Sequence, residues 1–218
     1  MAQFDILDTR QYRDDQANGD GWQYPTPASE DPKRTLMGAA QERWFADGLR
    51  RSKALWNVVP QQVVFSRRKN TTAASSKLSM DAWDGYPAAR ERFLTAVEQA
   101  GVKNLVLLTG DVHVAYALDV KRNFDDPNSR TVGVEFVGTS ISSDGDGEAH
   151  PSNWATLTAA NPHMKFYDGR RGYTLVTLDR HQARADYRAV SHITRPGGTL
   201  LTAASFVTEA GNPGVRPA

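Results

Sequence analysis

The chain has 218 residues, of which 26 are lysine or arginine and 25 are aspartate or glutamate, so its net charge is +1. This balance leaves no excess of cations to bind a polyanion, and no block of like charge marks an interaction tail, so no nucleic-acid partner is expected. The absence of cysteine excludes disulfides, thiolate metal sites and cysteine nucleophiles within the chain. No apolar run approaches the roughly 20 residues that cross a bilayer, and the first residues lack the pattern of a signal peptide.

The first quarter of the chain alternates between regular elements and a polar loop. Residues 4–9 predict a short strand, and the proline- and glycine-rich residues 14–33 predict a long loop. Apolar residues at helical spacing predict a helix over residues 38–53. Residues 56–65 (WNVVPQQVVF) then predict a buried strand, in which Pro60 indicates a bulge or a sheet edge.

The middle of the chain predicts a loop, a helix and a central strand. Residues 66–80 are polar and predict a second loop. A helix is expected to begin at Pro87, a favourable first position, and to end before Gly101. The continuous apolar run of residues 105–108 (LVLL) is typical of a strand that is covered on both faces.

The last part of the chain is predicted to consist mainly of strands. One strand is expected at residues 132–137 and a helix at 153–159. Three further strands are expected at residues 172–178, 183–190 and 205–209. The links between these three are too short for crossover helices, so they should be antiparallel. Strands with intervening helices, followed by strands alone, predict a layered α/β sandwich.

The segment LVLLTGDVH carries the clearest chemical pattern. Asp111 and His113 follow the predicted central strand with one residue between them, so both side chains can point to one side. A carboxylate and an imidazole together suit iron, zinc or manganese, and ligand sites of α/β folds lie at the carboxyl ends of strands. The alternative is a capping aspartate beside an ordinary histidine.

The segment DAWDGYP, residues 81–87, is a second candidate. Its acidic and aromatic side chains lie in a loop at the start of a predicted helix, where they could form the rim of a substrate pocket. Asp84 and Tyr86 are the candidate substrate-binding residues. The alternative is that Asp84 caps the helix while Trp83 and Tyr86 pack on the core.

Other polar clusters point to anion binding or exclude other enzymes. Arg10 and Arg13 follow the first predicted strand, where a guanidinium could bind phosphate, although surface ion pairs are the alternative. The turn at residues 138–145 resembles an anion-binding turn but lacks the lysine of a nucleotide-binding loop. No G-x-S-x-G motif is present, which argues against a serine esterase. His163 and residues 168–173 (DGRRGY) are interpreted as structural.

Eight segments, in the same order, resemble successive blocks of the PhoD-like alkaline phosphatases. They are ILDTRQYR, LMGAAQERWFADGL, WNVVPQQVVF, DAWDGYPAARERFL, LLTGDVHVAYA, EFVGTSISSDGDG, NPHMKFYDGRRGY and FVTEAGNPG. The resemblance implies a four-layer αββα metallophosphoesterase sandwich that hydrolyses phosphate monoesters or diesters. It also implies a site with ferric iron and calcium, in which the G-D-x-H block supplies Asp111 and His113 as metal-site residues. A periplasmic or extracellular location is a further implication.

The chain also departs from the family pattern. Family members are longer and begin with a cysteine ligand, a G-D-x-x-Y strand end and a W-D-D-H-E-x-x-N-N block, none of which is present here. We therefore expect residues 1–218 to be the C-terminal part of a single phosphatase domain whose N-terminal segment is absent. The alternative function is a non-catalytic remnant or binding module that keeps the sandwich without a full metal cluster.

Overall fold

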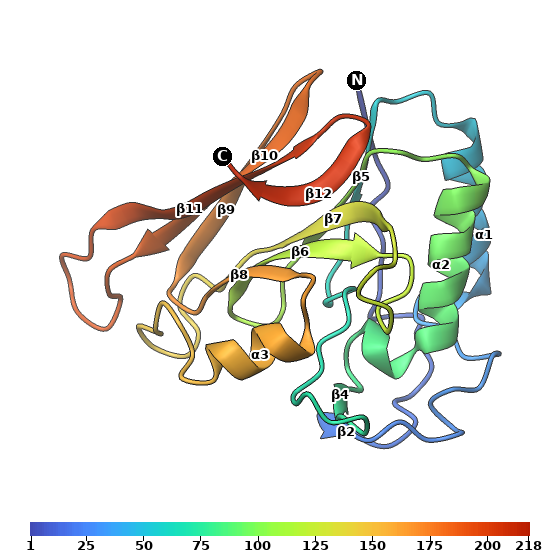
Figure 1. Ribbon diagram of the computed structural model, residues 1–218, viewed down its shortest axis with the longest axis horizontal. Coiled ribbons are helices and arrows are strands. Elements are labelled where there is room, and N and C mark those ends of the chain that lie inside the picture. Colours follow the sequence, from blue (N-terminus) through green and yellow to red (C-terminus); the bar gives the residue numbers. More distant parts are fainter.

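Two β-sheets lie face to face at the centre of the molecule (Figure 1). A computed structural model describes residues 1–218. The first sheet has six strands, in the spatial order β1 (Ala2–Phe4), β3 (Trp56–Pro60), β5 (Leu105–Thr109), β7 (Thr131–Val137), β6 (Ala115–Lys121) and β8 (Met164–Asp168). The second has four, in the order β12 (Asn212–Pro217), β11 (Leu200–Glu209), β10 (Gln182–Val190) and β9 (Gly172–Leu178).

The first sheet is parallel from β1 to β7, and β6 runs antiparallel to both of its neighbours. Strand β5 lies inside the sheet between β3 and β7, which confirms the predicted central strand. Its side chains alternate between two cores: Leu105 and Leu107 pack on the helical side, while Val106 packs between the two sheets. Burial on both faces explains why this strand is apolar throughout.

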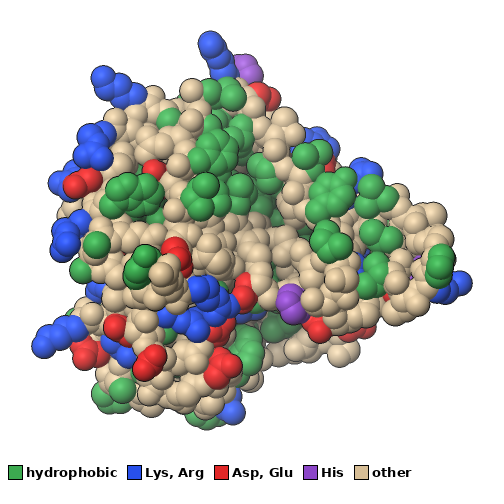
Figure 2. All heavy atoms as spheres, turned by 180° about the vertical axis from the view of Figure 1, so that it is seen from behind, with side chains coloured by type: hydrophobic (Ala, Val, Ile, Leu, Met, Phe, Trp, Pro, Cys, Tyr) green, Lys and Arg blue, Asp and Glu red, His purple; other side chains and the backbone are tan.

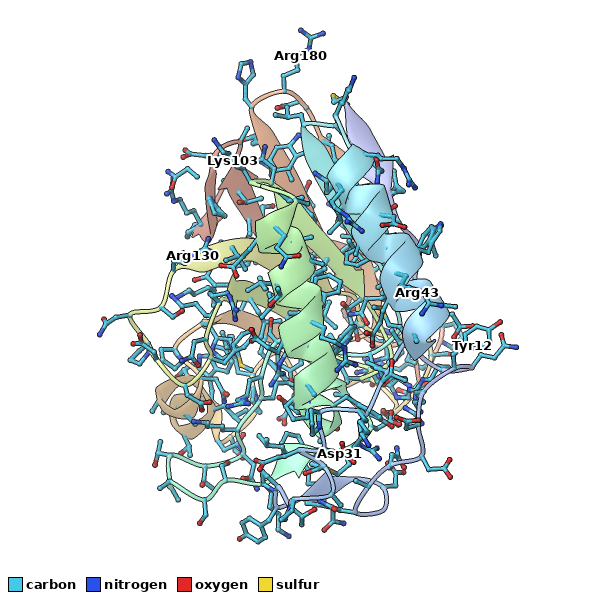
Figure 3. The ribbon with its side chains drawn as sticks, turned by 90° about the vertical axis from the view of Figure 1, so that its right-hand side faces the viewer. Tyr12, Asp31, Arg43, Lys103, Arg130 and Arg180 are labelled. Atoms are coloured by element: carbon cyan, nitrogen blue, oxygen red, sulfur yellow. The ribbon has the colours of Figure 1, made fainter.

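Helices α1 (Gly38–Arg51) and α2 (Pro87–Gln99) lie side by side over the face of the first sheet that points away from the second sheet (Figure 3). Their apolar faces meet at Phe45 and Phe93, whose stacked rings are 4.6 Å apart between centroids. Pro87 occupies the first turn of α2, and Gly101 follows the helix in the left-handed conformation, with φ of 66°. Both predicted helices are confirmed, as is α3 (Trp154–Ala160), which lies near β8 (Figure 1).

The second sheet is antiparallel throughout, as expected from its short connections. Along β10, Ala183, Ala185 and Tyr187 are buried against the first sheet and the intervening residues are partly exposed. The predicted α/β sandwich is therefore confirmed, and these residues form three of its layers: helices, the first sheet and the second sheet.

The strand predicted for residues 56–65 is shorter than expected. Strand β3 ends at Pro60, and it lies inside the sheet between β1 and β5, so the prediction of a bulge or an edge at Pro60 is wrong. The next residues leave the sheet, and the backbone amides of Phe65 and Ser66 donate to the buried carboxylate of Glu135, each at 2.8 Å. The apolar residues after Pro60 are therefore buried, although they do not pair with another strand.

Three strands of five or more residues were not predicted. Strand β6 directly follows the GDVH segment, whose residues were interpreted only for their chemistry. Strands β8 and β12 are edge strands, and β12 contains two prolines and a glycine, which only an edge tolerates.

The two predicted loops are largely irregular, apart from the two-residue strands β2 (Trp22–Gln23) and β4 (Leu78–Ser79), which pair with each other. The first strand, predicted at residues 4–9, begins earlier and ends at Phe4. None of the helices has the length and apolarity that crossing a membrane requires.

Candidate functional site

The site is built on a tight turn at the carboxyl end of β5. The amide of Val112 donates to the carbonyl of Gly110 at 2.9 Å, which closes a three-residue turn around Asp111. Asp111 has φ of 75°, His113 of 55° and Asp144 of 67°, and no other residue besides glycine has a positive φ. Such backbone is strained for side-chain-bearing residues, although aspartate and histidine tolerate it best, and it gathers at functional sites.

Arg10 links Asp111 to a second carboxylate. Its guanidinium forms an ion pair with Asp111 and another with Asp81, the latter at 2.8 Å. Arg13 also donates to Asp81 at 2.8 Å. The segment after β1 thus brings Arg10 to Asp111 at the end of β5, 101 residues away in sequence, and Arg13 to Asp81.

The charges of this cluster stabilise one another. Burial disfavours the charge of Arg10, but hydrogen bonds and attraction from Asp81 and Asp111 outweigh it and raise the pKa of Arg10. Burial likewise opposes the ionised form of Asp81, yet the bonds from Arg10 and Arg13 lower the pKa of that carboxyl. The cluster therefore contains two charged guanidinium groups on a partly exposed surface.

His113 is oriented by Asp144. Its Nδ1 lies 2.7 Å from Oδ2 of Asp144, so Nδ1 donates to the carboxylate and Nε2 is the ring nitrogen that this contact leaves unoccupied. This is the arrangement in which a carboxylate fixes the ring of a metal-binding histidine. Asp144 comes from the glycine-rich turn that sequence analysis singled out only as an anion-binding turn.

Arg171 fastens this turn to the segment that carries His113. Arg171 is 2% exposed, and its guanidinium donates to the carbonyl of His113 at 2.9 Å and to Oγ of Ser140 at 2.8 Å. It also donates to the carbonyls of Ser143 and Gly169. A buried cation thus holds the backbone on both sides of the His113–Asp144 pair.

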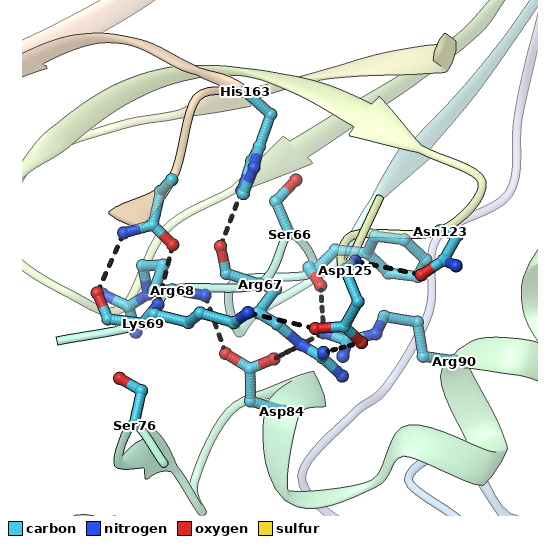
Figure 4. A network of polar contacts seen from close by, with 12 residues as sticks. Ser66, Arg67, Arg68, Lys69, Ser76, Asp84, Arg90, Asn123, Asp125 and His163 are labelled. Carbon is cyan, nitrogen blue, oxygen red and sulfur yellow. Dashed lines mark hydrogen bonds and ion pairs between the residues drawn. The ribbon is translucent and has the colours of Figure 1, made fainter. Parts of the chain in front are cut away.

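Asp84, expected in the substrate pocket, lies in the core. Its carboxylate accepts from Nη1 of Arg90 at 2.7 Å and from the amide of Arg68 at 2.9 Å (Figure 4). Asp84 is 3% exposed, and it does not cap α2, so that alternative prediction is wrong. The carboxylate instead joins the start of α2 to the segment that follows β3.

Tyr86 is also buried, and its hydroxyl donates to the carbonyl of Asp14 at 2.6 Å. Burial raises the pKa of this phenol. Trp83 and Tyr86 both belong to the helical-side core, as the alternative interpretation predicted. The structure therefore separates Asp84 and Tyr86 from the surface at Arg10 and Asp111, and their contact with a substrate stays a prediction.

The donors present match a metal site in type but not in number. Asp111 and His113 offer a carboxylate oxygen and an imidazole nitrogen, the mixed set that suits iron. No three histidine, aspartate or glutamate side chains in the chain come together as a metal-binding group.

Three site residues were missed from the sequence. Asp81 lies in the DAWDGY segment, but spacing alone does not reveal which of its two acids faces the surface. Asp144 and Arg171 lie in two of the segments that were singled out, and only the distance in space shows that they serve the same histidine.

Comparison with known proteins adds independent information. A family model described as PhoD-like phosphatase matches residues 1–187. Alkaline phosphatase D of Bacillus subtilis (strain 168) is 44% identical over 216 residues, which covers 99% of this chain and 37% of that protein. A solved structure of PhoD superposes with a TM-score of 0.97 at 44% identity, covering 100% of this chain and 42% of that one. The chain spans about two fifths of the length of these relatives.

Proposed function

The chain belongs to the PhoD-like phosphatase family, and on that premise we propose that it forms part of a metal-dependent phosphoesterase, to whose metal site it contributes Asp111 and His113. The observation that carries this proposal is the backbone of the site. The three strained residues of the chain, Asp111, His113 and Asp144, lie at one strand end, where a hydrogen bond joins two of them. Strain is retained where a function requires it.

Within this proposal, the metals are iron and calcium, as the family resemblance implies. Bound metal ions would neutralise the charge of the phosphate and act as Lewis acids on the ester. Asp111 would contribute a carboxylate oxygen and His113 its Nε2, since Asp144 occupies Nδ1. The remaining donors would come from the part of the fold that this chain does not span.

Arg10 is the proposed phosphate-binding residue. A guanidinium binds two phosphate oxygens in a planar, bidentate geometry. Arg10 lies beside Asp111 and is partly exposed, so a phosphate held by the metal ions would be within its reach. Its two carboxylate partners, Asp81 and Asp111, occupy the guanidinium, and a bound phosphate would replace one of them. The substrate would be a phosphate monoester or diester, and we propose a periplasmic or extracellular location by family resemblance.

A non-catalytic binding module is the second candidate. The shortage of metal donors within the chain favours it, because two donors leave most coordination positions to water. The two proposals differ in whether the rest of the fold would give the protein phosphatase activity. An enzyme regains activity when the missing donors are supplied, and a binding module does not.

The experiment compares two proteins on a chromogenic phosphate monoester and diester, with iron and calcium supplied. One is the 218-residue chain. The other is the same chain joined to the part of the Bacillus subtilis relative that it does not match. We expect turnover only in the joined protein, and a loss of at least about 10²-fold in Asp111→Ala or His113→Ala.

The matched control is His181→Ala, an exposed histidine in the turn between β9 and β10. It should leave the turnover of the joined protein unchanged. Full activity in the two site variants would refute the assignment of Asp111 and His113. Metal-dependent turnover by the short chain would show that its own residues complete the site.

A further inference from the structure

Three arginines of the chain are buried, and the guanidinium of one of them has no hydrogen-bond acceptor. Arg90 pairs with the carboxylate of Asp84 and donates to a carbonyl, and Arg171 donates to four oxygen atoms. Arg68 is 9% exposed, yet its guanidinium forms no hydrogen bond or ion pair within the chain, and its Nε is buried without a partner. A buried charge is costly unless it is paired, so an anionic partner is expected for this guanidinium.

The cations on either side of Arg68 are paired. Arg67 and Lys69 both form ion pairs with Asp125, that of Lys69 at 3.1 Å. Figure 4 shows the three cations in succession along the segment that follows β3. In the same network, the carboxylate of Asp84 is bound by Arg90, and it accepts only the backbone amide of Arg68. The acids near this segment are thus bound by other cations, and the side chain of Arg68 has none.

Two aromatic rings hold the guanidinium of Arg68 instead. Its central carbon lies 5.6 Å from the ring centroid of Trp22 and 5.8 Å from that of Tyr116. Contacts of this kind stabilise the positive charge but supply no oxygen acceptor for the N–H groups. The side chain is therefore ordered while its donors stay available to a ligand.

One of the two rings belongs to the side of the site that carries Asp81. Strand β2, which contains Trp22, pairs with β4, and β4 ends two residues before Asp81. Gln16, from the loop before β2, donates to the carboxylate of Asp81 at 2.8 Å. Trp22 and Asp81 are therefore parts of one connected loop structure, and Asp81 is a carboxylate that binds Arg10.

The other ring belongs to the side of the site that carries Asp111 and His113. Tyr116 follows His113 by three residues and is buried. Val112, the residue between Asp111 and His113, packs against the hydrophobic cluster that contains Tyr116. Arg68 is therefore held between the two segments whose side chains form the candidate site.

Arg68 and Arg10 are suited to different groups. Arg10 pairs with Asp81 and Asp111, and Arg68 shares neither of these partners. The surroundings add little general attraction for an anion: the net charge of the chain is +1, and in the lower part of the face in Figure 2 the Lys and Arg side chains lie beside Asp and Glu side chains. An anion that binds here therefore depends on an individual cation without a carboxylate partner.

We propose that Arg68 binds a second anionic group of the substrate and thereby sets specificity. The inference rests on the proposed function, in which Arg10 binds the phosphate that is hydrolysed. The substrate class is a phosphate ester whose alcohol part carries a carboxylate or a further phosphate. Either group accepts two parallel hydrogen bonds from a guanidinium. Because the two rings already order the Arg68 side chain, binding costs little side-chain entropy.

The first test uses the 218-residue chain and inorganic phosphate as the probe, without metal or turnover. Heteronuclear NMR follows the Nε–H signal of each arginine during the titration, and Arg68→Lys identifies the signal of Arg68. We expect that signal to shift and saturate, and the signal of the exposed Arg180 to shift at least about 10-fold less. No shift at Arg68, or equal shifts at the two arginines, would overturn the proposal.

The second test compares two substrates of the joined protein, nitrophenyl phosphate and the same ester with a carboxylate on its ring. We expect the KM of the carboxylate ester to be lower by about 10-fold or more, since a hydrogen bond between charged groups contributes a factor of this size. Arg68→Met should raise the KM of the carboxylate ester to that of the plain ester. Its circular dichroism should match that of the unchanged protein.

The matched control is Lys77→Met, which removes another cation that lies over an aromatic ring, 5.5 Å from the centroid of Tyr24. This variant should keep the difference in KM. A difference that survives in Arg68→Met would overturn the proposal, as it would if an acid from the rest of the fold paired with Arg68. If the joined protein hydrolyses neither ester, the proposed function fails, and the phosphate titration of the 218-residue chain decides the role of Arg68 by itself.

Discussion

Arg171 donates a hydrogen bond to the carbonyl oxygen of His113 at 2.9 Å, across 58 residues of sequence. The same guanidinium binds Ser140 and Ser143, which precede Asp144 in the glycine-rich turn. One buried cation therefore sets the distance between His113 and the carboxylate that orients its ring. This makes Arg171 a positioning residue for the site, without contact to a metal or substrate.

Removal of this cation should destabilise the turn. In Arg171→Met, four oxygen acceptors lose the hydrogen bond from the guanidinium, and we expect the free energy of unfolding to fall by about 2–4 kcal/mol. Denaturant titration measures this loss, and hydrogen exchange should accelerate within residues 138–147. Arg180→Met is the matched control, since Arg180 is exposed in the turn between β9 and β10 and its loss should cost no more than about 1 kcal/mol. Equal effects of the two variants would contradict the assigned role.

Substitution of either member of the Asp84–Arg90 ion pair should cause a large loss of stability, and the two losses should not add. Both side chains are almost fully buried, 2.7 Å apart, and burial lowers the pKa of Arg90. Asp84→Asn or Arg90→Met should each cost about 3–5 kcal/mol, because the remaining charge stays buried after it loses its nearest opposite charge. The double variant should cost much less than the sum of the two. A double-mutant cycle by denaturant unfolding tests this, with the exposed pair Asp47 and Arg50 as control.

His163 predicts a loss of stability in mild acid. Burial lowers the pKa of this histidine from 6.5 to about 4 in the folded protein. The unfolded chain therefore binds the proton first, so stability is complete above pH 6.5 and falls as the pH drops toward 4, by about 3 kcal/mol.

His163→Gln removes this titration and can keep the donor that Nε2 supplies to the carbonyl of Arg67 at 2.7 Å. The difference in unfolding free energy between variant and unchanged chain should therefore depend on pH between 6.5 and 4. The exposed His181→Gln should show no such difference. Parallel pH profiles for His163→Gln and the unchanged chain would refute the prediction.

Limited proteolysis should cut first in the two long loops. Residues 14–33 and 66–80 have little regular structure, and residues 71–75 are fully on the surface. A protease of broad specificity should therefore cleave within these segments, identified by mass spectrometry of the first fragments. Initial cuts within residues 105–120, which form β5, the site turn and most of β6, would contradict the structure's distribution of burial.

The elements with the strongest local signals were predictable from the sequence. Helical spacing around Phe45 and Leu49, proline at the start of α2 and the apolar run of β5 each identified an element, because each reflects burial along one stretch of chain. The same run placed Asp111 and His113 at a strand end. Edge strand β12 was not predicted, because prolines oppose strand formation except at the edge of a sheet. Which strand lies at an edge depends on the order of the whole sheet.

The sequence by itself thus determined the α/β class, the central strand and the position of the candidate metal ligands along the chain. Only the tertiary structure decided which polar residues meet. It directed Asp84 into the core and Asp81 to the surface, and it joined Arg10 to Asp111 over 101 residues and His113 to Asp144 over 31. Local periodicity records whether a side chain is buried. Its partner depends on the sheet order and on the turns at strand ends, which arise from the packing of the whole chain.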